Sequence, residues 1–256
     1  MIDPMKSLRR SKLLIWLVLV LPLGAAACGT TAGSSTPPTS PASSLVSTVT
    51  PASPSPASSP SPSSPPVFHS TTSVIDSATR ARMASSWHPG CPVAIRDLRY
   101  LTMSYWGFDG AVHTGEMVIN GNVAGAVVKV FGKLFGARFP VRRMQLVDVY
   151  GGDDDRSMAA NNTSAFNCRA VTGGTSWSQH AYGWAIDINP IQNPYVSRGG
   201  TVLPPAGAPY ANRSLTAKGM IHAGDAVVRA FASVGWGWGG SWSGTRDYQH
   251  FSATGR

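Results

Sequence analysis

This chain of 256 residues has no apolar run long enough to cross a membrane. Its longest such run, LLIWLVLVLPLG at residues 13–24, is shorter than the roughly 20 residues that a spanning helix needs. The run follows basic residues and precedes the small residues of AAAC, which end at Cys28. This order of basic, apolar and small residues predicts an export signal over residues 1–28.

Beyond the predicted export signal, the chain also lacks blocks of basic residues. Charged residues make up 13% of the sequence, and the formal net charge of +9 falls to +6 once residues 1–27, with four basic residues and one acidic residue, are set aside. The remaining charges are spread out, which argues against dedicated nucleic-acid binding. A mildly cationic surface is compatible instead with an anionic cell-wall environment.

Cysteine is scarce, and each of the three cysteines has a predicted role. The residues before Cys28 fit lipoprotein processing, in which this cysteine is acylated and becomes the new N-terminus. Ala25 and Ala27 also fit ordinary signal cleavage, which would release a cell-wall or freely secreted protein. We therefore expect an exported, extracytoplasmic protein. Of the two alternatives, we favour lipoprotein processing, in which a lipid on Cys28 holds the protein to the cell membrane.

The other two cysteines, Cys91 and Cys168, form one even pair in an oxidising compartment, which predicts a disulfide. A bridge between two cysteines 77 residues apart in the sequence would stabilise the fold by about 4 to 5 kcal/mol in the chain-entropy model. Two free buried thiols are the alternative.

Apolar residues are almost absent from residues 29–70, where PASPSPASSPSPSSPP is the most biased stretch. Such a composition cannot bury a core, so we expect a disordered, extended tether of up to roughly 3.1 Å per residue. Aromatic and aliphatic residues return afterwards, and residues 71–256 are expected to form one catalytic domain.

The patterns within residues 71–256 predict an α+β fold with a small antiparallel sheet, flanked by helices, that carries the chemistry. NVAGAVVKVFGKLFGARFP predicts a helix that Asn122 caps and that stops before Pro140. A second helix is expected over residues 216–234. Strands are expected in RDLRYLTMSYWGF, GEMVING, RRMQLVDVY, GWAIDI and DYQHFS, and a long loop with a solvated turn in GGDDDRSMAANNTS.

Candidate site residues lie in SWSQHAYGWAIDINP and in DYQHF near the end of the chain. Asp187 stands in a strand between two isoleucines, where a carboxylate must be neutral, hydrogen-bonded or metal-bound. Together with His180 and His250 it would make the ligand set of a catalytic zinc site, which leaves one position open. A buried turn with a capped histidine is the alternative.

These two segments resemble the D-alanyl-D-alanine carboxypeptidase and L-alanyl-D-glutamate endopeptidase family of zinc metallopeptidases, whose pattern is S-x-H-x(6)-D followed by acid-x-x-H. The resemblance covers most of residues 90–256. It implies that His180, Asp187 and His250 bind Zn²⁺ and that Asp247 is the general base. Family members use glutamate or aspartate as this base, and the one glutamate of the chain, Glu116, lies far upstream.

The resemblance also implies that Arg169 polarises the scissile carbonyl and that Ser178 helps to hold the substrate. Each residue has a structural alternative. Arg169 could pair with a loop carboxylate such as Asp153 or Asp155, and Ser178 could cap the turn before the first histidine. Asp247 could be an ordinary acid at a strand end.

The sequence thus predicts an exported zinc-dependent peptidase that cuts a peptide bond in peptidoglycan stem peptides or cross-links with a zinc-activated water, as a carboxypeptidase or an endopeptidase. Its expected partners are peptidoglycan peptides and, through the lipid anchor, the membrane, and we expect a monomer. A non-catalytic cell-wall-binding or zinc-binding lipoprotein would have no physical need for Asp247. An adhesin or structural lipoprotein would leave the histidine and aspartate cluster unexplained.

Overall fold

The structure is a computed structural model in which residues 65–256 are described. The predicted export signal, Cys28 and most of the predicted tether lie outside the described residues. Within residues 65–256, no helix combines the length and the apolar character that crossing a bilayer requires.

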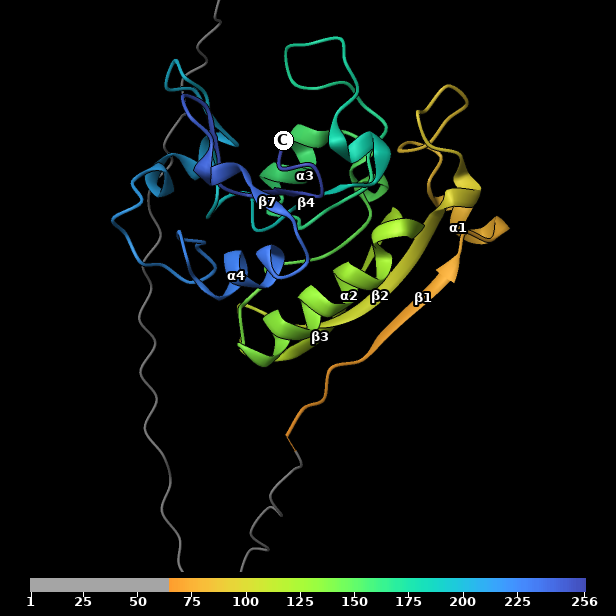
Figure 1. Cartoon of the computed structure of the whole chain (residues 1–256), viewed down its shortest axis with the longest axis horizontal. Coiled ribbons are helices and arrows are strands. Elements are labelled where there is room, and N and C mark those ends of the chain that lie inside the picture. Colours follow the sequence, from red (N-terminus) through yellow and green to blue (C-terminus); the bar gives the residue numbers. More distant parts are fainter. Residues whose placement is uncertain (1–64) are drawn as a thin grey trace, which may run out of the picture. The chain divides into compact units, whose positions relative to one another are not determined.

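The first sheet contains the strands that the alternating segments predict. Its antiparallel order is β1 (Ser70–Val74), β2 (Leu98–Trp106) and β3 (Val112–Asn120), as Figure 1 shows. Helix α1 (Ser77–Arg82) connects β1 to the segment before β2. The two long strands bury apolar side chains on both faces of the sheet. Leu101, Met103, Met117 and Ile119 join the same core cluster as α2, whereas Leu98 and Val118 pack in a second cluster on the other face.

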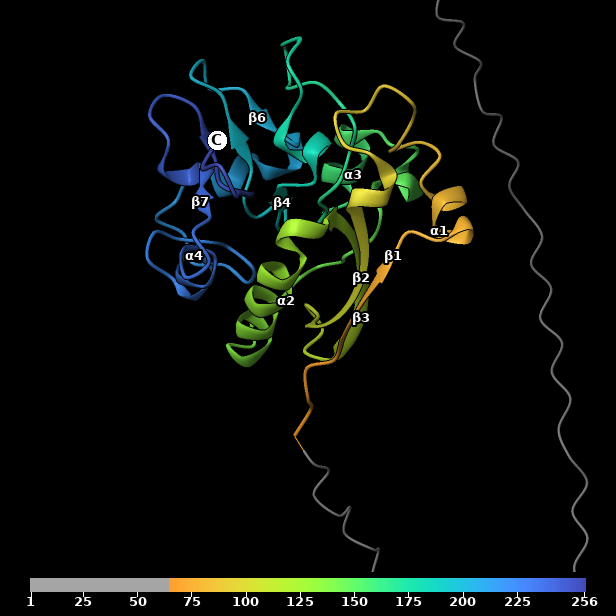
Figure 2. The same cartoon turned by 45° about the vertical axis from the view of Figure 1, so that its right-hand side comes forward.

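Helix α2 (Gly121–Gly136) follows β3 directly and ends before Pro140, as predicted. Its cap is Asn120, whose side chain accepts a hydrogen bond from the backbone N–H of Asn122, so the predicted cap was wrong by two residues. Asn120 has extended backbone angles whereas Asn122 already lies in the first turn, and a cap residue must stand outside the helix. Figure 2 shows α2 between the first sheet and α4 (Ala226–Ala232).

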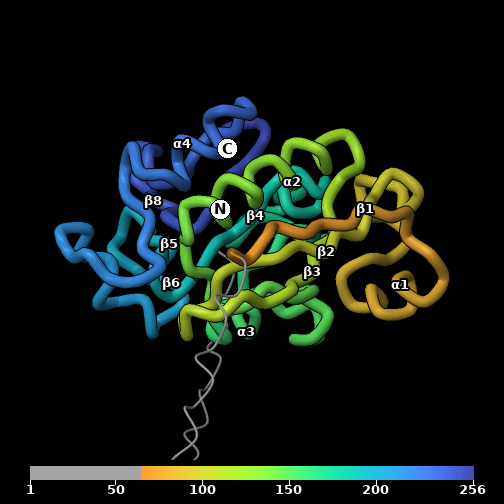
Figure 3. The backbone as a smooth tube through the Cα atoms, turned by 90° about the horizontal axis from the view of Figure 1, so that it is seen from below, coloured from red at the N-terminus to blue at the C-terminus, as the bar shows by residue number. Residues whose placement is uncertain are grey.

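Two further antiparallel sheets complete the three sheets within the described residues. The second has the order β4 (Ala185–Asp187), β9 (His250–Ser252), β7 (Gly237–Trp238). The third has the order β6 (Val202–Leu203), β5 (Tyr195–Val196), β8 (Arg246–Asp247), and Figure 3 shows it at the end of the domain away from α1. The α+β class is confirmed, with small antiparallel sheets and a few helices.

Two predictions between α2 and β4 were wrong. RRMQLVDVY was expected to be a strand, but it contains a 3₁₀ helix at Val147–Tyr150 and only an isolated bridge from Met144 to Thr163. The expected loop and solvated turn contain helix α3 (Asp154–Ala159), because Asp153 caps it by accepting a hydrogen bond from the N–H of Arg156. A short helix with a good cap needs little apolar periodicity, so the pattern did not reveal it.

The second predicted helix is shorter than expected. Only Ala226–Ala232 is helical, whereas 216–234 was predicted. Gly219 and Gly224 have positive φ angles of 80° and 72°, which break the helical path. Asp225 then caps α4 by accepting from the N–H of Val228.

The core ties the second sheet to the rest of the domain. Ile186 of β4 and Phe251 of β9 are fully buried in the same cluster as the apolar side of α2. Phe251 stacks on Phe231 of α4, with ring centroids 4.0 Å apart. The strands that carry the predicted site residues therefore stand on a packed scaffold.

Candidate metal centre and active site

Three of the predicted site residues meet in one buried cluster. His180, Asp187 and His250 are only 4%, 4% and 6% exposed, and their ligand atoms all lie within 4.8 Å of one another. Asp187 Oδ2 is 3.2 Å from His180 Nε2, and Asp187 Oδ1 is 3.1 Å from His250 Nδ1. The two imidazole nitrogens are 3.3 Å apart. Two nitrogens and one carboxylate thus converge on one point.

Strand pairing and one tight turn produce this convergence. Asp187 and His250 are direct partners in the β4–β9 register. His180 lies in a 3₁₀ helix, Gln179–Tyr182, that Ser178 caps and Gly183 ends with a φ of 67°. A Cβ on Gly183 would lie 2.6 Å from the backbone nitrogen of Asn120, so this position requires glycine.

The outer nitrogen of each imidazole faces a backbone carbonyl. His180 Nδ1 is 2.6 Å from Ala165 O, and His250 Nε2 is 3.4 Å from Arg256 O. A carbonyl only accepts hydrogen bonds, so each outer nitrogen is the donor and each neutral ring keeps its inner lone pair for a cation. The set has the donor chemistry of a three-ligand zinc site.

The charges in the cluster favour a cation. Burial raises the pKa of Asp187, but His180 and His250 outweigh it and hold that pKa well below its usual range. Burial lowers the pKa of His250, yet its hydrogen bond to Asp187 and the charge of that aspartate leave the pKa raised. The buried carboxylate therefore stabilises a positive charge here, which a proton or a metal ion can supply.

Asp247 lies beside this cluster at the end of β8, where it pairs with Tyr195 of β5. Its Oδ1 atom is buried and has no hydrogen-bond partner within residues 65–256. Burial, followed by the negative charge of Asp187, raises the pKa of Asp247 to about 7. A carboxyl group with a pKa near neutrality is suited to taking up and returning a proton.

Arg169 pairs with Asp154, at a distance of 2.7 Å from Nη2 to Oδ2. Neither alternative partner, Asp153 or Asp155, takes this place. The two side chains are only 23% and 20% exposed, and Arg169 Nη1 donates to the carbonyl of Ala170. Arg169 Nε is buried and has no partner in the described part of the chain.

Sequence reasoning missed Asp154. Asp154 lines the wall of a cavity, and its burial there raises its pKa although Arg169 opposes this. No sequence pattern pointed to this residue, because the face that it shares with the buried Ser157 and Met158 exists only once α3 has formed.

All these groups line one cavity of about 450 Å³. Its polar wall includes the cluster and its neighbours: His180, Asp187, His250, Asp247, Arg169, Asp154 and Ser178. Its apolar wall includes Val171, Trp177, Leu203 and Trp242. Ser178 caps the turn before His180, because its Oγ accepts a hydrogen bond from the N–H of His180. Ser178 also lines the cavity.

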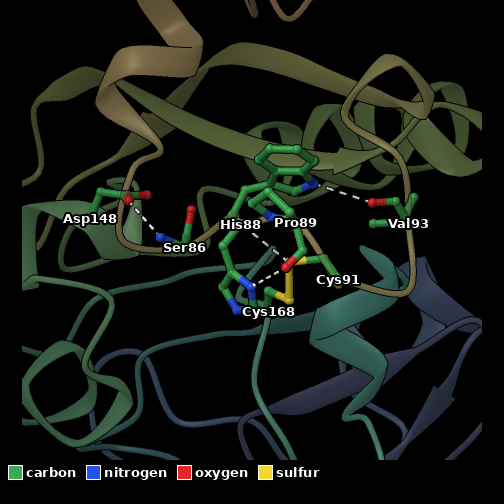
Figure 4. Close-up of a disulfide and its surroundings, with 8 residues drawn as sticks. Ser86, His88, Pro89, Cys91, Val93, Asp148 and Cys168 are labelled. Carbon is green, nitrogen blue, oxygen red and sulfur yellow. Dashed lines mark hydrogen bonds between the residues drawn. A yellow bond between two sulfur atoms is a disulfide. The ribbon is translucent and has the colours of Figure 1, made fainter.

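The predicted disulfide between Cys91 and Cys168 is present, so the alternative of two free thiols is wrong (Figure 4). The backbone N–H of Cys168 also donates to Ser86 O, which fixes the chain directly before Arg169. His88 lies next to the bridge, and its backbone N–H points to Cys91 Sγ. The side chains of His88, Cys91 and Cys168 lie as close together as the ligands of a metal site. The two sulfurs are bonded to each other, however, and so do not serve as thiolate ligands.

The fold and the buried cluster together define a class of protein, an α+β domain with the donor set of a zinc hydrolase. Residues 172–253 match the model of a family described as D-alanyl-D-alanine carboxypeptidase. The matched segment contains His180, Asp187, Asp247 and His250 and begins just after Arg169. No curated protein and no solved structure matches the chain. The family match confirms the resemblance and supports a peptidase.

Proposed function

We propose that this chain is an exported zinc-dependent peptidase that hydrolyses a peptide bond in peptidoglycan stem peptides or cross-links. One observation carries the proposal. His180, Asp187 and His250 converge on the wall of a cavity that Asp247 also lines, with a carboxyl oxygen that has no hydrogen-bond partner in the described part of the chain. The family match over the same residues supports the choice of a peptide as substrate.

His180 Nε2, His250 Nδ1 and a carboxylate oxygen of Asp187 would hold the zinc ion. A bound zinc ion supplies Lewis acidity, which polarises a carbonyl group and makes water a better nucleophile. The carbonyls of Ala165 and Arg256 keep the two rings oriented for this purpose.

Asp247 and Arg169 carry out the remaining steps. Asp247 Oδ1, a buried acceptor without a partner within residues 65–256, takes a proton from the attacking water and returns it to the leaving amine. Arg169 Nε donates a hydrogen bond to the oxygen of the scissile carbonyl, where negative charge develops. Asp154 and the Ala170 carbonyl hold the rest of the guanidinium in place.

Export remains part of the proposal. Residues 1–28 would direct it, Cys28 would carry a lipid that anchors the protein to the membrane, and residues 29–70 would tether the catalytic domain 71–256 within reach of the cell wall. The disulfide supports this location, because such bridges persist in oxidising compartments outside the cytoplasm.

Mass spectrometry of purified peptidoglycan after digestion tests the function. The zinc-loaded protein should release products that are absent when a chelator is present. Loss of a terminal alanine would identify a carboxypeptidase, whereas conversion of cross-linked dimers into monomers would identify an endopeptidase. Binding to peptidoglycan without any product would contradict the proposal and identify a non-catalytic wall-binding protein.

A further inference from the structure

The buried polar atoms without a partner gather in one place. Within residues 65–256, four buried side-chain nitrogen or oxygen atoms lack a hydrogen-bond partner: Arg169 Nε, Gln179 Oε1, Asp247 Oδ1 and Gln249 Oε1. All four residues line the cavity of the candidate active site. An unpaired buried polar atom costs free energy, so its partner is expected to come from outside residues 65–256.

Arg169 and Asp247 already have roles in the proposed reaction, but the two glutamines do not. Gln249 is only 3% exposed and lies between Asp247 and His250. Its Nε2 points to Met158 Sδ, 3.3 Å away, which leaves Oε1 as the free end of the amide. Its backbone carbonyl accepts a hydrogen bond from the N–H of Ile188, so the backbone that carries this side chain is held in place.

Gln179 directly precedes His180 in the sequence, just as Gln249 directly precedes His250. It lies between Ser178 and His180 in the capped 3₁₀ turn, and its backbone carbonyl accepts a hydrogen bond from the N–H of Trp184. Each glutamine thus neighbours a candidate zinc ligand in the sequence and presents a carbonyl oxygen without a donor in the described structure.

The chemistry of these atoms selects the kind of group that they bind. An amide oxygen accepts hydrogen bonds and does not donate them, so an anionic group would be a poor partner. A peptide in the cavity brings backbone N–H donors together with the carbonyl that Arg169 would bind. Two acceptors and one donor are therefore complementary to a stretch of peptide backbone.

We propose that Gln249 and Gln179 bind the peptide substrate by accepting hydrogen bonds from its backbone N–H groups. This inference rests on the proposed function and adds the residues that orient the peptide across the zinc site. Both side chains bind substrate and take no part in proton transfer.

The test compares zinc-loaded full-length variants on soluble muropeptides released from purified peptidoglycan. Gln249→Met keeps the length of the side chain but removes its acceptor, and Gln249→Glu keeps an acceptor. Gln249→Met should raise KM about tenfold with kcat almost unchanged, which is the size of one neutral hydrogen bond. Gln249→Glu should have a KM nearer to that of the wild type.

Gln179→Met should have the same effect, and the double variant should raise KM by roughly the product of the two single effects. Gln145→Met is the matched control, because Gln145 Oε1 accepts a hydrogen bond from Tyr150 and does not line the cavity. Its KM should equal that of the wild type. Zinc content is measured for every variant.

The outcomes separate this inference from the function on which it rests. An active wild type with unchanged KM in Gln249→Met and Gln179→Met would overturn the inference alone and assign both oxygens to solvent. A variant that loses zinc would show that its glutamine supports the metal ligands instead. A zinc-loaded wild type that cleaves no muropeptide would overturn the proposed function, and this inference with it.

Discussion

Asp187 and His250 face each other across β4 and β9, with Asp187 Oδ1 3.1 Å from His250 Nδ1. They are 63 residues apart in the sequence, so the candidate metal centre forms only when the last strand pairs with the strand after the 3₁₀ turn. Ile186 and Phe251, the next pair in the register, are fully buried. The same pairing therefore assembles the site and part of the core.

The three cluster residues should be necessary for zinc binding. We expect His180→Ala, Asp187→Ala and His250→Ala each to lose the one equivalent of zinc, because three protein ligands are the usual number in a catalytic site. Elemental analysis of the purified variants measures this. His113→Ala is the control, since its exposed side chain pairs with Asp109. Full zinc occupancy in His250→Ala would remove that residue from the ligand set.

Asp247→Asn should keep its fold and its zinc but lose turnover. The amide preserves the shape of the side chain and cannot take a proton from water, so kcat should fall by roughly 10² to 10⁴ fold with little change in KM. Asp247→Glu should recover part of the rate. Near-normal turnover in Asp247→Asn would identify a structural acid, and loss of zinc would identify a ligand.

Asp154→Asn should weaken catalysis through Arg169. The partly buried ion pair holds the guanidinium in the cavity wall, so removing the charge should lower kcat/KM by roughly tenfold or more, the scale of a hydrogen bond to a charged group. Asp155→Asn changes an exposed neighbour in the same helix and should leave kcat/KM unchanged. Equal effects of the two substitutions would argue against a specific role for the Asp154 pair.

The disulfide should contribute strongly to stability. Replacing both Cys91 and Cys168 by serine opens a loop of 77 residues, which should lower the free energy of unfolding by about 4 to 5 kcal/mol in the chain-entropy model. Urea unfolding of the variant and the wild type measures the difference. A decrease below about 1 kcal/mol would mean that the loop is already constrained in the unfolded chain.

Glu116 should make stability depend on pH on the acidic side. Burial raises its pKa, but hydrogen bonds from Arg82 and Tyr100 outweigh this and leave the pKa lowered. The stabilisation is therefore fully present above the unfolded pKa of about 4.3 and is lost as the pH falls through the lower folded pKa.

The matched variant for this prediction is Glu116→Gln. Its deficit in unfolding free energy should be largest near neutral pH and should shrink as the solution is acidified below about pH 4. Unfolding experiments at several pH values measure this. A deficit that stays constant across this range would assign the effect to packing rather than to charge.

The sequence alone determined the local features that short-range patterns encode. The apolar stripe of α2 predicted this helix, because one buried face imposes a regular spacing. Alternating residues predicted β2 and β3, although these strands bury side chains on both faces. The even pair of Cys91 and Cys168 predicted the bridge. The family pattern selected the histidines and aspartates that the structure then brings together in one cavity.

Only the tertiary structure decided the contacts between distant segments. Three consecutive aspartates were available to Arg169, and the orientation of α3 turned Asp154 toward it while Asp153 capped the helix. The sequence also did not show that the side-chain oxygens of Gln179 and Gln249 have no hydrogen-bond donor within residues 65–256, because a residue type does not reveal whether its partners exist. An apolar stripe or an alternating pattern is a local signal, but which strands pair and which side chains share a cavity depends on how the elements pack, and packing involves the whole chain.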